Sequence, residues 1–87
     1  MDISVIIPTH KPQRYIEVCL RSLDAQTLDK NRYEVLIILN GEKEPYYSTI
    51  QHLLDSYELN GRLLYTDVAG VSNARNIGLD NAEGNYI

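Results

Sequence analysis

Cysteine is almost absent from this chain, because Cys19 is the only one among its 87 residues. A single cysteine excludes an internal disulfide framework and a cysteine metal cluster, and it is compatible with a reducing compartment. No apolar run approaches the roughly 20 residues that span a bilayer. The N-terminus also lacks a basic region followed by a long apolar stretch, the pattern of a secretory signal. We therefore expect a cytoplasmic protein without a membrane span in this chain.

Basic residues are also in the minority, with eight Lys and Arg against twelve Asp and Glu and a net charge of -4. This balance argues against a general nucleic-acid binder, which needs a basic face, but it leaves room for one local diphosphate pocket. The glycines form neither the G-x-G-x-x-G fingerprint nor a phosphate-loop pattern. No His/Asp/Glu cluster has metal-ligand spacing, and no nucleophile–base pair can be assembled. The residues offer a candidate ligand site and no catalytic group.

Apolar residues alternate between two kinds of pattern along the chain. Short, nearly continuous apolar runs rich in β-branched residues predict buried strands, the first of which is ended by Pro8. Strands are expected at residues 3–7, 34–39 and 62–66, with a fourth beginning at 85–87. Apolar stripes with helical spacing predict helices from Pro12 to about residue 26, over 46–57 and over 71–82. The last of these has small residues on its inner side, which predicts close packing on the sheet. The order β-α-β-α-β-α-β predicts a three-layer α/β/α, Rossmann-like fold with a mostly parallel sheet and right-handed crossovers.

Ligands of open α/β sheets bind beyond the carboxyl ends of the strands. This rule selects residues 8–11, 40–43 and 67–75. In the first segment, Pro8, Thr9 and His10 form a polar turn whose imidazole could stack on a planar base. The alternative is a plain loop with an exposed histidine. In the second segment, the amide of Asn40 could hydrogen-bond to a base, or Asn40 could serve only the turn that it forms with Gly41.

The third segment contains a cation at the start of a predicted helix. Ser72 is the expected N-cap, which places Arg75 where a capping box would have Glu or Gln. A cation in the first turn opposes the helix dipole. The arrangement makes better sense if an anion binds there, because free N–H groups and a guanidinium together form a phosphate site. The alternatives are a solvated arginine or one paired with Asp67.

Three segments, in this order and spacing, resemble the family 2 glycosyltransferases of the GT-A fold. They are Ser4 to His10 followed by Leu20-Arg21-Ser22-Leu23 and Gln26-Thr27, then Tyr33 to Gly41, and finally Gly70 to Gly78 closed by Ala82 to Ile87. The resemblance implies that residues 1–87 are the N-terminal nucleotide-sugar-binding part of a GT-A domain, incomplete at its C-terminal side. The donor of such enzymes is usually of the UDP or dTDP type.

The resemblance also implies a role for each nucleotide-binding residue. Pro8, Thr9 and His10 match the loop that holds the nucleobase, and His10 stands where an aromatic residue commonly stacks. Asn40 occupies a position that usually carries an aspartate bonded to the base, so the base preference is left open. Arg75 matches an arginine that approaches the donor nucleotide.

The resemblance places the catalytic groups elsewhere in the enzyme. A D-x-D-type motif that holds Mg²⁺ or Mn²⁺ is expected after the fourth strand, about where this chain stops at Ile87. The acceptor-binding half and its carboxylate base would lie further on. The implied reaction is inverting sugar transfer to an acceptor hydroxyl in polysaccharide or glycoconjugate biosynthesis, and we expect these 87 residues alone to be inactive. The alternative is a non-catalytic interaction or nucleotide-binding module whose exposed sheet edges are completed by another chain or a second copy.

Overall fold

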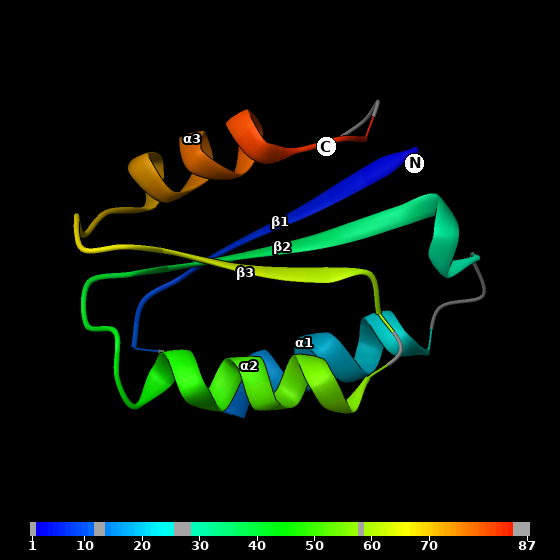
Figure 1. Cartoon of the computed structure of the whole chain (residues 1–87), viewed down its shortest axis with the longest axis horizontal. Helices are drawn as coiled ribbons and strands as arrows, with labels where there is room; N and C mark the ends of the chain where they lie inside the picture. Colours follow the sequence, from blue (N-terminus) through cyan, green and yellow to red (C-terminus); the bar gives the residue numbers. More distant parts are fainter. Residues whose placement is uncertain (1, 12–13, 26–28, 58, 85–87) are drawn as a thin grey trace.

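The computed structural model describes residues 2–11, 14–25, 29–57 and 59–84 (Figure 1). The strands are β1 (Ile3–Thr9), β2 (Tyr33–Asn40) and β3 (Gly61–Thr66). The helices are α1 (Arg14–Asp24), the 3-10 helix η1 (Lys30–Arg32), α2 (Tyr46–Ser56) and α3 (Val71–Asn81). The strands form a parallel sheet in the order β1-β2-β3, with Val5 opposite Val35 and Ile37 opposite Leu63.

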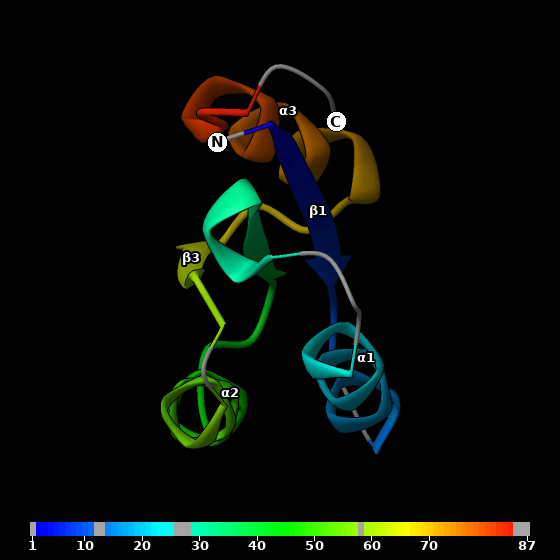
Figure 2. The same cartoon turned by 90° about the vertical axis from the view of Figure 1, so that its right-hand side faces the viewer.

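The sheet is covered by helices on both faces. Figure 2 shows α1 and α2 side by side on one face and α3 on the other. This arrangement confirms the predicted α/β/α layers and the parallel sheet. The described helices follow the predicted order, although α1 ends at Asp24, before the predicted limit of about residue 26.

The central strand β2 forms the middle of the core, and all eight of its residues are buried. Its alternate side chains point to opposite faces, as the pleat of a strand requires. Val35, Ile37 and Leu39 pack in the cluster that contains residues of α1 and α2. Leu36 and Ile38 pack in the cluster that contains Ala74 of α3. The uninterrupted apolar run is therefore explained by a strand covered on both faces.

The first strand differs from its prediction in two respects. It continues through Pro8, which lies opposite Ile38, and ends at Thr9. Within the described residues β1 pairs only with β2, and proline is tolerated in a strand that lies at a sheet edge. At this edge the apolar residues of β1, such as Ile3 and Val5, are half-buried rather than fully buried. The fourth strand predicted to begin at 85–87 lies outside the described residues.

The three α-helices each have 11 residues and bury one apolar side. α2 buries Ile50 and Leu54, whereas α3 buries only the small residues Ala74 and Gly78. A β-carbon built on Gly78 would lie 2.5 Å from Cγ2 of Ile6, so glycine permits the close approach of α3 to the sheet. This confirms the close packing expected from small residues. In the described part of the chain, no helix is long and apolar enough to cross a bilayer.

Candidate functional site

Asn40 ties together three segments at the carboxyl ends of the strands. It is the last residue of β2 and is only 2% exposed. Its Nδ2 donates a hydrogen bond to the carbonyl of Thr9, the last residue of β1, over 2.8 Å. Its Oδ1 accepts one from the backbone N–H of Gly70, just before α3, over 3.2 Å. The amide therefore bonds within the protein, and the predicted contact of Asn40 with a base stays a prediction.

His10 lies directly beside this junction. Its Nδ1 is 2.9 Å from the backbone carbonyl oxygen of Asn40, while the side chain as a whole is exposed. The ring edge packs on Gly41, where an added β-carbon would lie 2.7 Å from Cε1 and Nδ1. Gly41 also has a φ of +89°, which favours glycine. The turn after β2 thus needs glycine both for its backbone conformation and for the imidazole that rests on it.

The turn residue Gly41 is also held from β3. Its N–H donates to the carbonyl of Thr66 over 3.1 Å. Its carbonyl accepts a 2.6 Å hydrogen bond from the hydroxyl of Tyr65. Beside it, the ammonium of Lys43 lies 4.8 Å from the ring centre of Tyr47 and 5.6 Å from that of Tyr65, both within the range of cation–π attraction. Sequence patterns did not point to this support, because it joins residues of separate elements.

Thr9 and Pro8 contribute mainly backbone to the junction. Thr9 is 2% exposed, and its hydroxyl hydrogen-bonds to that of Tyr15 in α1. Its carbonyl is already bonded to the amide of Asn40. Pro8 is half-buried within β1. Of the predicted nucleotide-binding residues, the structure therefore brings Thr9, His10 and Asn40 into contact, and His10 is the exposed member of the three.

Among the described residues, Arg75 forms no hydrogen bond with Thr9, His10 or Asn40. It lines a groove of about 480 Å³ together with Ile3, Ser4, Val5, Ile6 and Leu79. The groove runs beside β1 and includes neither His10 nor Asn40 in its lining. Within the described residues Arg75 forms no ion pair with Asp67, which removes one of the alternatives considered for it. Its contact with a nucleotide stays a prediction.

The prediction that Ser72 caps α3 was wrong. The N-cap is Gly70, whose backbone N–H is bonded to Asn40, and no side chain caps the helix. Ser72 lies inside the first turn, and Arg75 is the fifth residue of a helix that begins at Val71. The dipole effect falls off within the first turn. The dipole argument for an anion at Arg75 therefore weakens, because the helix begins earlier than expected.

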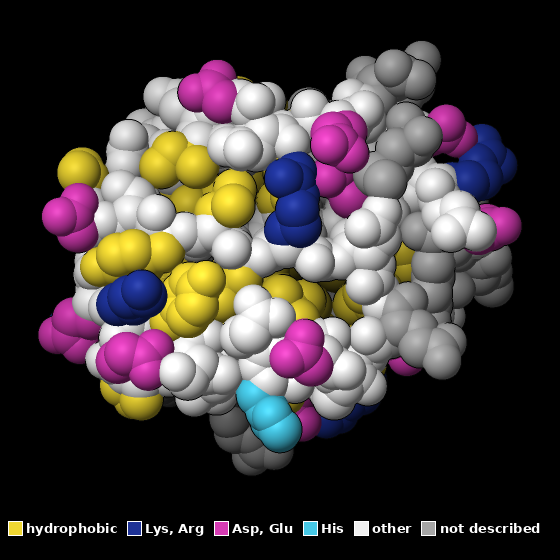
Figure 3. All heavy atoms as spheres, viewed as in Figure 1, with side chains coloured by type: hydrophobic (Ala, Val, Ile, Leu, Met, Phe, Trp, Pro, Cys, Tyr) yellow, Lys and Arg dark blue, Asp and Glu magenta, His cyan; other side chains and the backbone are white. Residues whose placement is uncertain are grey.

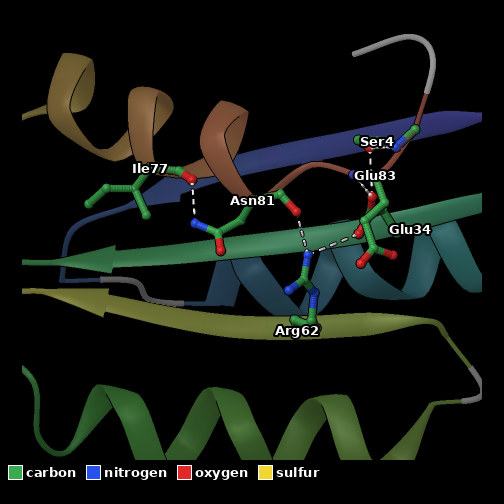
Figure 4. Close-up of polar contacts among 7 residues, drawn as sticks. Ser4, Glu34, Arg62, Ile77, Asn81 and Glu83 are labelled. Carbon is green, nitrogen blue, oxygen red and sulfur yellow. Dashed lines mark hydrogen bonds and ion pairs between the residues drawn. The ribbon is translucent and has the colours of Figure 1, made fainter.

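A second polar cluster lies at the amino ends of the strands, and no motif in the chain had pointed to it. Figure 4 shows Glu34 of β2 meeting Ser4 of β1, Arg62 of β3 and the backbone of Glu83. The hydroxyl of Ser4, in turn, accepts the N–H of Gly84 over 2.9 Å.

Glu34 is 2% exposed, yet its surroundings favour the charged form of its carboxyl group by lowering its pKa. Burial raises the pKa of Glu34, but hydrogen bonds from Glu83, Ser4 and Arg62, together with the charge of Arg62, outweigh it and lower the pKa. Arg62 also donates to the carbonyl of Asn81 over 2.6 Å. The cluster fastens the end of α3 to all three strands, so its role is structural.

Residues 4–87 match the model of the family described as glycosyl transferase family 2. The chain belongs to this family. Glycosyltransferase AglE of Haloferax volcanii is 30% identical over 82 residues, covering 94% of this chain and 27% of AglE. Glycosyltransferase GlyA of Streptococcus pneumoniae is 34% identical over 87 residues, covering 98% of this chain and 12% of GlyA. The chain thus spans only a small part of these family 2 relatives.

The fold is that of a family 2 enzyme of known structure. The poly(ribitol-phosphate) β-N-acetylglucosaminyltransferase TarS of Staphylococcus aureus is 29% identical over 87 residues, which cover 15% of its length. A crystal structure of TarS residues 1–349 in complex with UDP-GlcNAc superposes with a TM-score of 0.85 and 26% identity, covering all of this chain and 26% of that one. The expected GT-A fold and family membership are confirmed.

Metal ligands were not expected in this part of the chain. Across the described residues, no group of three or more His, Cys, Asp or Glu side chains could hold a metal ion. The described side chains therefore do not fit the Mg²⁺ or Mn²⁺ that the family resemblance implies for a full-length enzyme. The chemistry available at the carboxyl ends of the strands is hydrogen bonding and stacking.

Proposed function

We propose that this chain is the nucleotide-sugar-binding part of a glycosyltransferase that uses a UDP- or dTDP-type donor. The enzyme would transfer the sugar with inversion to an acceptor hydroxyl during polysaccharide or glycoconjugate biosynthesis in the cytoplasm. The observation that carries the proposal is the junction of Thr9, His10 and Asn40 at the carboxyl ends of parallel strands. It occurs in a family 2 chain whose structural neighbour TarS has been crystallised with UDP-GlcNAc.

In the proposed function, three of the described residues contribute to nucleotide binding in different ways. The buried amide of Asn40 holds the loops after β1 and before α3 in place. His10, resting on Gly41, offers an exposed imidazole to the base. Arg75 adds a positive charge at the groove beside β1. Neither a general base nor a metal ion is assigned to the described residues, so activation of the acceptor is assigned to the rest of a longer enzyme.

Isothermal titration of the 87-residue protein with UDP and with dTDP tests the proposal. We expect weak binding by the wild type and several-fold weaker binding by Arg75→Ala, because a charge-assisted contact to the nucleotide is lost. Arg21→Ala is the matched control, since Arg21 is also exposed but pairs with Glu17 on α1. Equal affinities of the wild type and Arg75→Ala would remove Arg75 from the site. Absence of binding to either nucleotide would contradict the donor-binding function.

A second candidate is a non-catalytic α/β module completed by another chain or a second copy. One observation favours it: within the described residues, β1 and β3 each have only one strand neighbour. Figure 3 shows hydrophobic side chains gathered across the middle of one face, with acidic side chains around them. Open edges and exposed apolar groups favour association. Solution scattering distinguishes the two states, since a compact monomer at high concentration would contradict self-association.

A further inference from the structure

The contact between His10 and Asn40 determines which ring nitrogen carries the proton. Nδ1 of His10 lies 2.9 Å from the backbone carbonyl oxygen of Asn40. A carbonyl oxygen has no proton to donate, so Nδ1 must be the donor. In a neutral imidazole one nitrogen is protonated and the other carries a lone pair. Neutral His10 therefore has Nδ1–H and an unprotonated Nε2.

The ring is held in this orientation by the turn beneath it. Gly41 leaves no space between its Cα and the ring edge, because an added β-carbon would lie 2.7 Å from Cε1 and Nδ1. Gly41 itself is fixed by the hydroxyl of Tyr65 and the carbonyl of Thr66. Rotating the ring by half a turn would put a carbon at the carbonyl of Asn40 and lose the hydrogen bond. The imidazole is thus oriented before any ligand binds, which reduces the ordering cost of binding.

The other nitrogen is directed away from this support. The β-carbon position of Gly41 is 4.0 Å from Nε2, farther than from the other two ring atoms. Within the described residues His10 has no hydrogen bond besides the one to Asn40, and its side chain is exposed. The lone pair of Nε2 therefore has a fixed direction at the surface and can accept a hydrogen bond from a ligand.

We propose that His10 is a specificity-determining residue whose Nε2 accepts a hydrogen bond from an N–H or O–H group of the nucleotide. The inference rests on the proposed donor-binding function. The ligand class is a nucleoside diphosphate that presents such a donor, either the imide N–H of uracil or thymine or a ribose hydroxyl. This role differs from stacking, because a stacked ring needs only its face and is indifferent to the position of the proton.

Nitrogen NMR of the free wild-type protein tests the first step. With ¹⁵N-labelled histidine in a mildly alkaline buffer, the two-bond correlations of His10 identify the protonated nitrogen, and His10→Phe assigns the signals. We expect the Nδ1–H form. On addition of UDP, the Nε2 signal should move in the direction of hydrogen-bond acceptance. A His10 ring protonated at Nε2 in the free protein overturns the proposal, whether or not the protein binds UDP.

Binding measurements with modified ligands test the second step. The ligands are UDP, UDP methylated at N3 of the base, and 2′,3′-dideoxy-UDP. One of the two analogues should bind the wild type about three- to tenfold more weakly than UDP does, the loss expected for one hydrogen bond. His10→Asn keeps an N–H donor near the Nδ1 position and removes Nε2, whereas His10→Phe keeps an aromatic face. In both variants the difference between UDP and that analogue should disappear.

The outcomes separate this inference from the proposed function. If both analogues bind the wild type as tightly as UDP, the acceptor role is wrong and nucleotide binding stands. The same conclusion follows if the loss with an analogue persists unchanged in both His10 variants. If the wild type binds neither UDP nor dTDP, the proposed function and the role of His10 fail together.

Discussion

The substitution Glu34→Gln keeps the shape of a buried side chain and removes its charge. In the folded chain, Oε2 of Glu34 accepts the hydroxyl of Ser4 over 2.8 Å and the N–H of Glu83 over 2.6 Å. Oε1 accepts Nη2 of Arg62 over 3.3 Å. Glutamine can keep only some of these hydrogen bonds, because its NH₂ group donates and cannot accept a hydrogen bond from the donor that it would face.

The expected loss follows from these contacts. Hydrogen bonds to a charged group contribute about 1.5–3 kcal/mol each. The side chain of Arg62 is 41% exposed, so its share is reduced by solvent screening. We therefore expect Glu34→Gln to lower the free energy of unfolding by about 2–3 kcal/mol, a large part of the roughly 5–15 kcal/mol that stabilises a typical domain.

The loss should depend on pH in a defined direction. Burial raises the pKa of Glu34, but the hydrogen bonds and the charge of Arg62 outweigh it and bring the pKa below the ordinary value of 4.5. A lowered folded-state pKa gives stability that is fully present above the unfolded-state value and disappears as the pH falls through the folded-state value. The stability difference between the wild type and Glu34→Gln should be constant near neutrality and shrink below pH 4.5.

Urea unfolding followed by circular dichroism at several pH values measures this difference. The matched control is Glu17→Gln on the surface of α1, where Glu17 lies 3.2 Å from Arg21 in an exposed ion pair. Such a pair contributes about 0.5 kcal/mol or less. Similar losses in the two variants at neutral pH would refute the reasoning, as would a loss in Glu34→Gln that does not change in acid.

Two further predictions concern close contacts. Gly78→Ala should lower the free energy of unfolding by about 1–2 kcal/mol, because overpacking against the stiff side chain of Ile6 outweighs the gain in helix propensity. Equal or higher stability in urea would contradict this prediction and show that α3 can move away from the sheet. Asn40→Ala should cost about 1–3 kcal/mol, because the carbonyl of Thr9 and the N–H of Gly70 lose their partner. Hydrogen exchange at the Gly70 amide should also become faster in Asn40→Ala, and an unchanged exchange rate would contradict the bond.

Much of the fold could be predicted because the signals for it are local. The apolar run of β2 requires burial on both faces, and the spacing of Ile50 and Leu54 in α2 needs a helix with one buried side. The small residues of α3 likewise predicted its close packing on the sheet. Boundaries were less well predicted: Pro8 ended the predicted first strand, yet β1 runs past it. Among the described strands β1 lies at the sheet edge, where proline is tolerated.

The candidate site was predicted only as a set of segments. The rule for parallel sheets placed His10 and Asn40 at the same end of the sheet, and they lie in contact. The rule could not show that the amide of Asn40 is occupied by Thr9 and Gly70. These contacts join residues about 30 positions apart, so their geometry depends on how the strands and α3 pack. No periodic pattern in the amino-acid sequence predicts such contacts.

The amino-acid sequence by itself determined the order of elements, the buried central strand and the family, because apolar periodicity and short motifs are properties of neighbouring residues. The tertiary structure decided that Gly70 rather than Ser72 begins α3, that Arg75 lies beside β1, and that Glu34 fastens the end of α3. The physical reason is the same in each case: a hydrogen bond or a groove is formed by whichever groups packing brings together, and packing is a property of the whole chain.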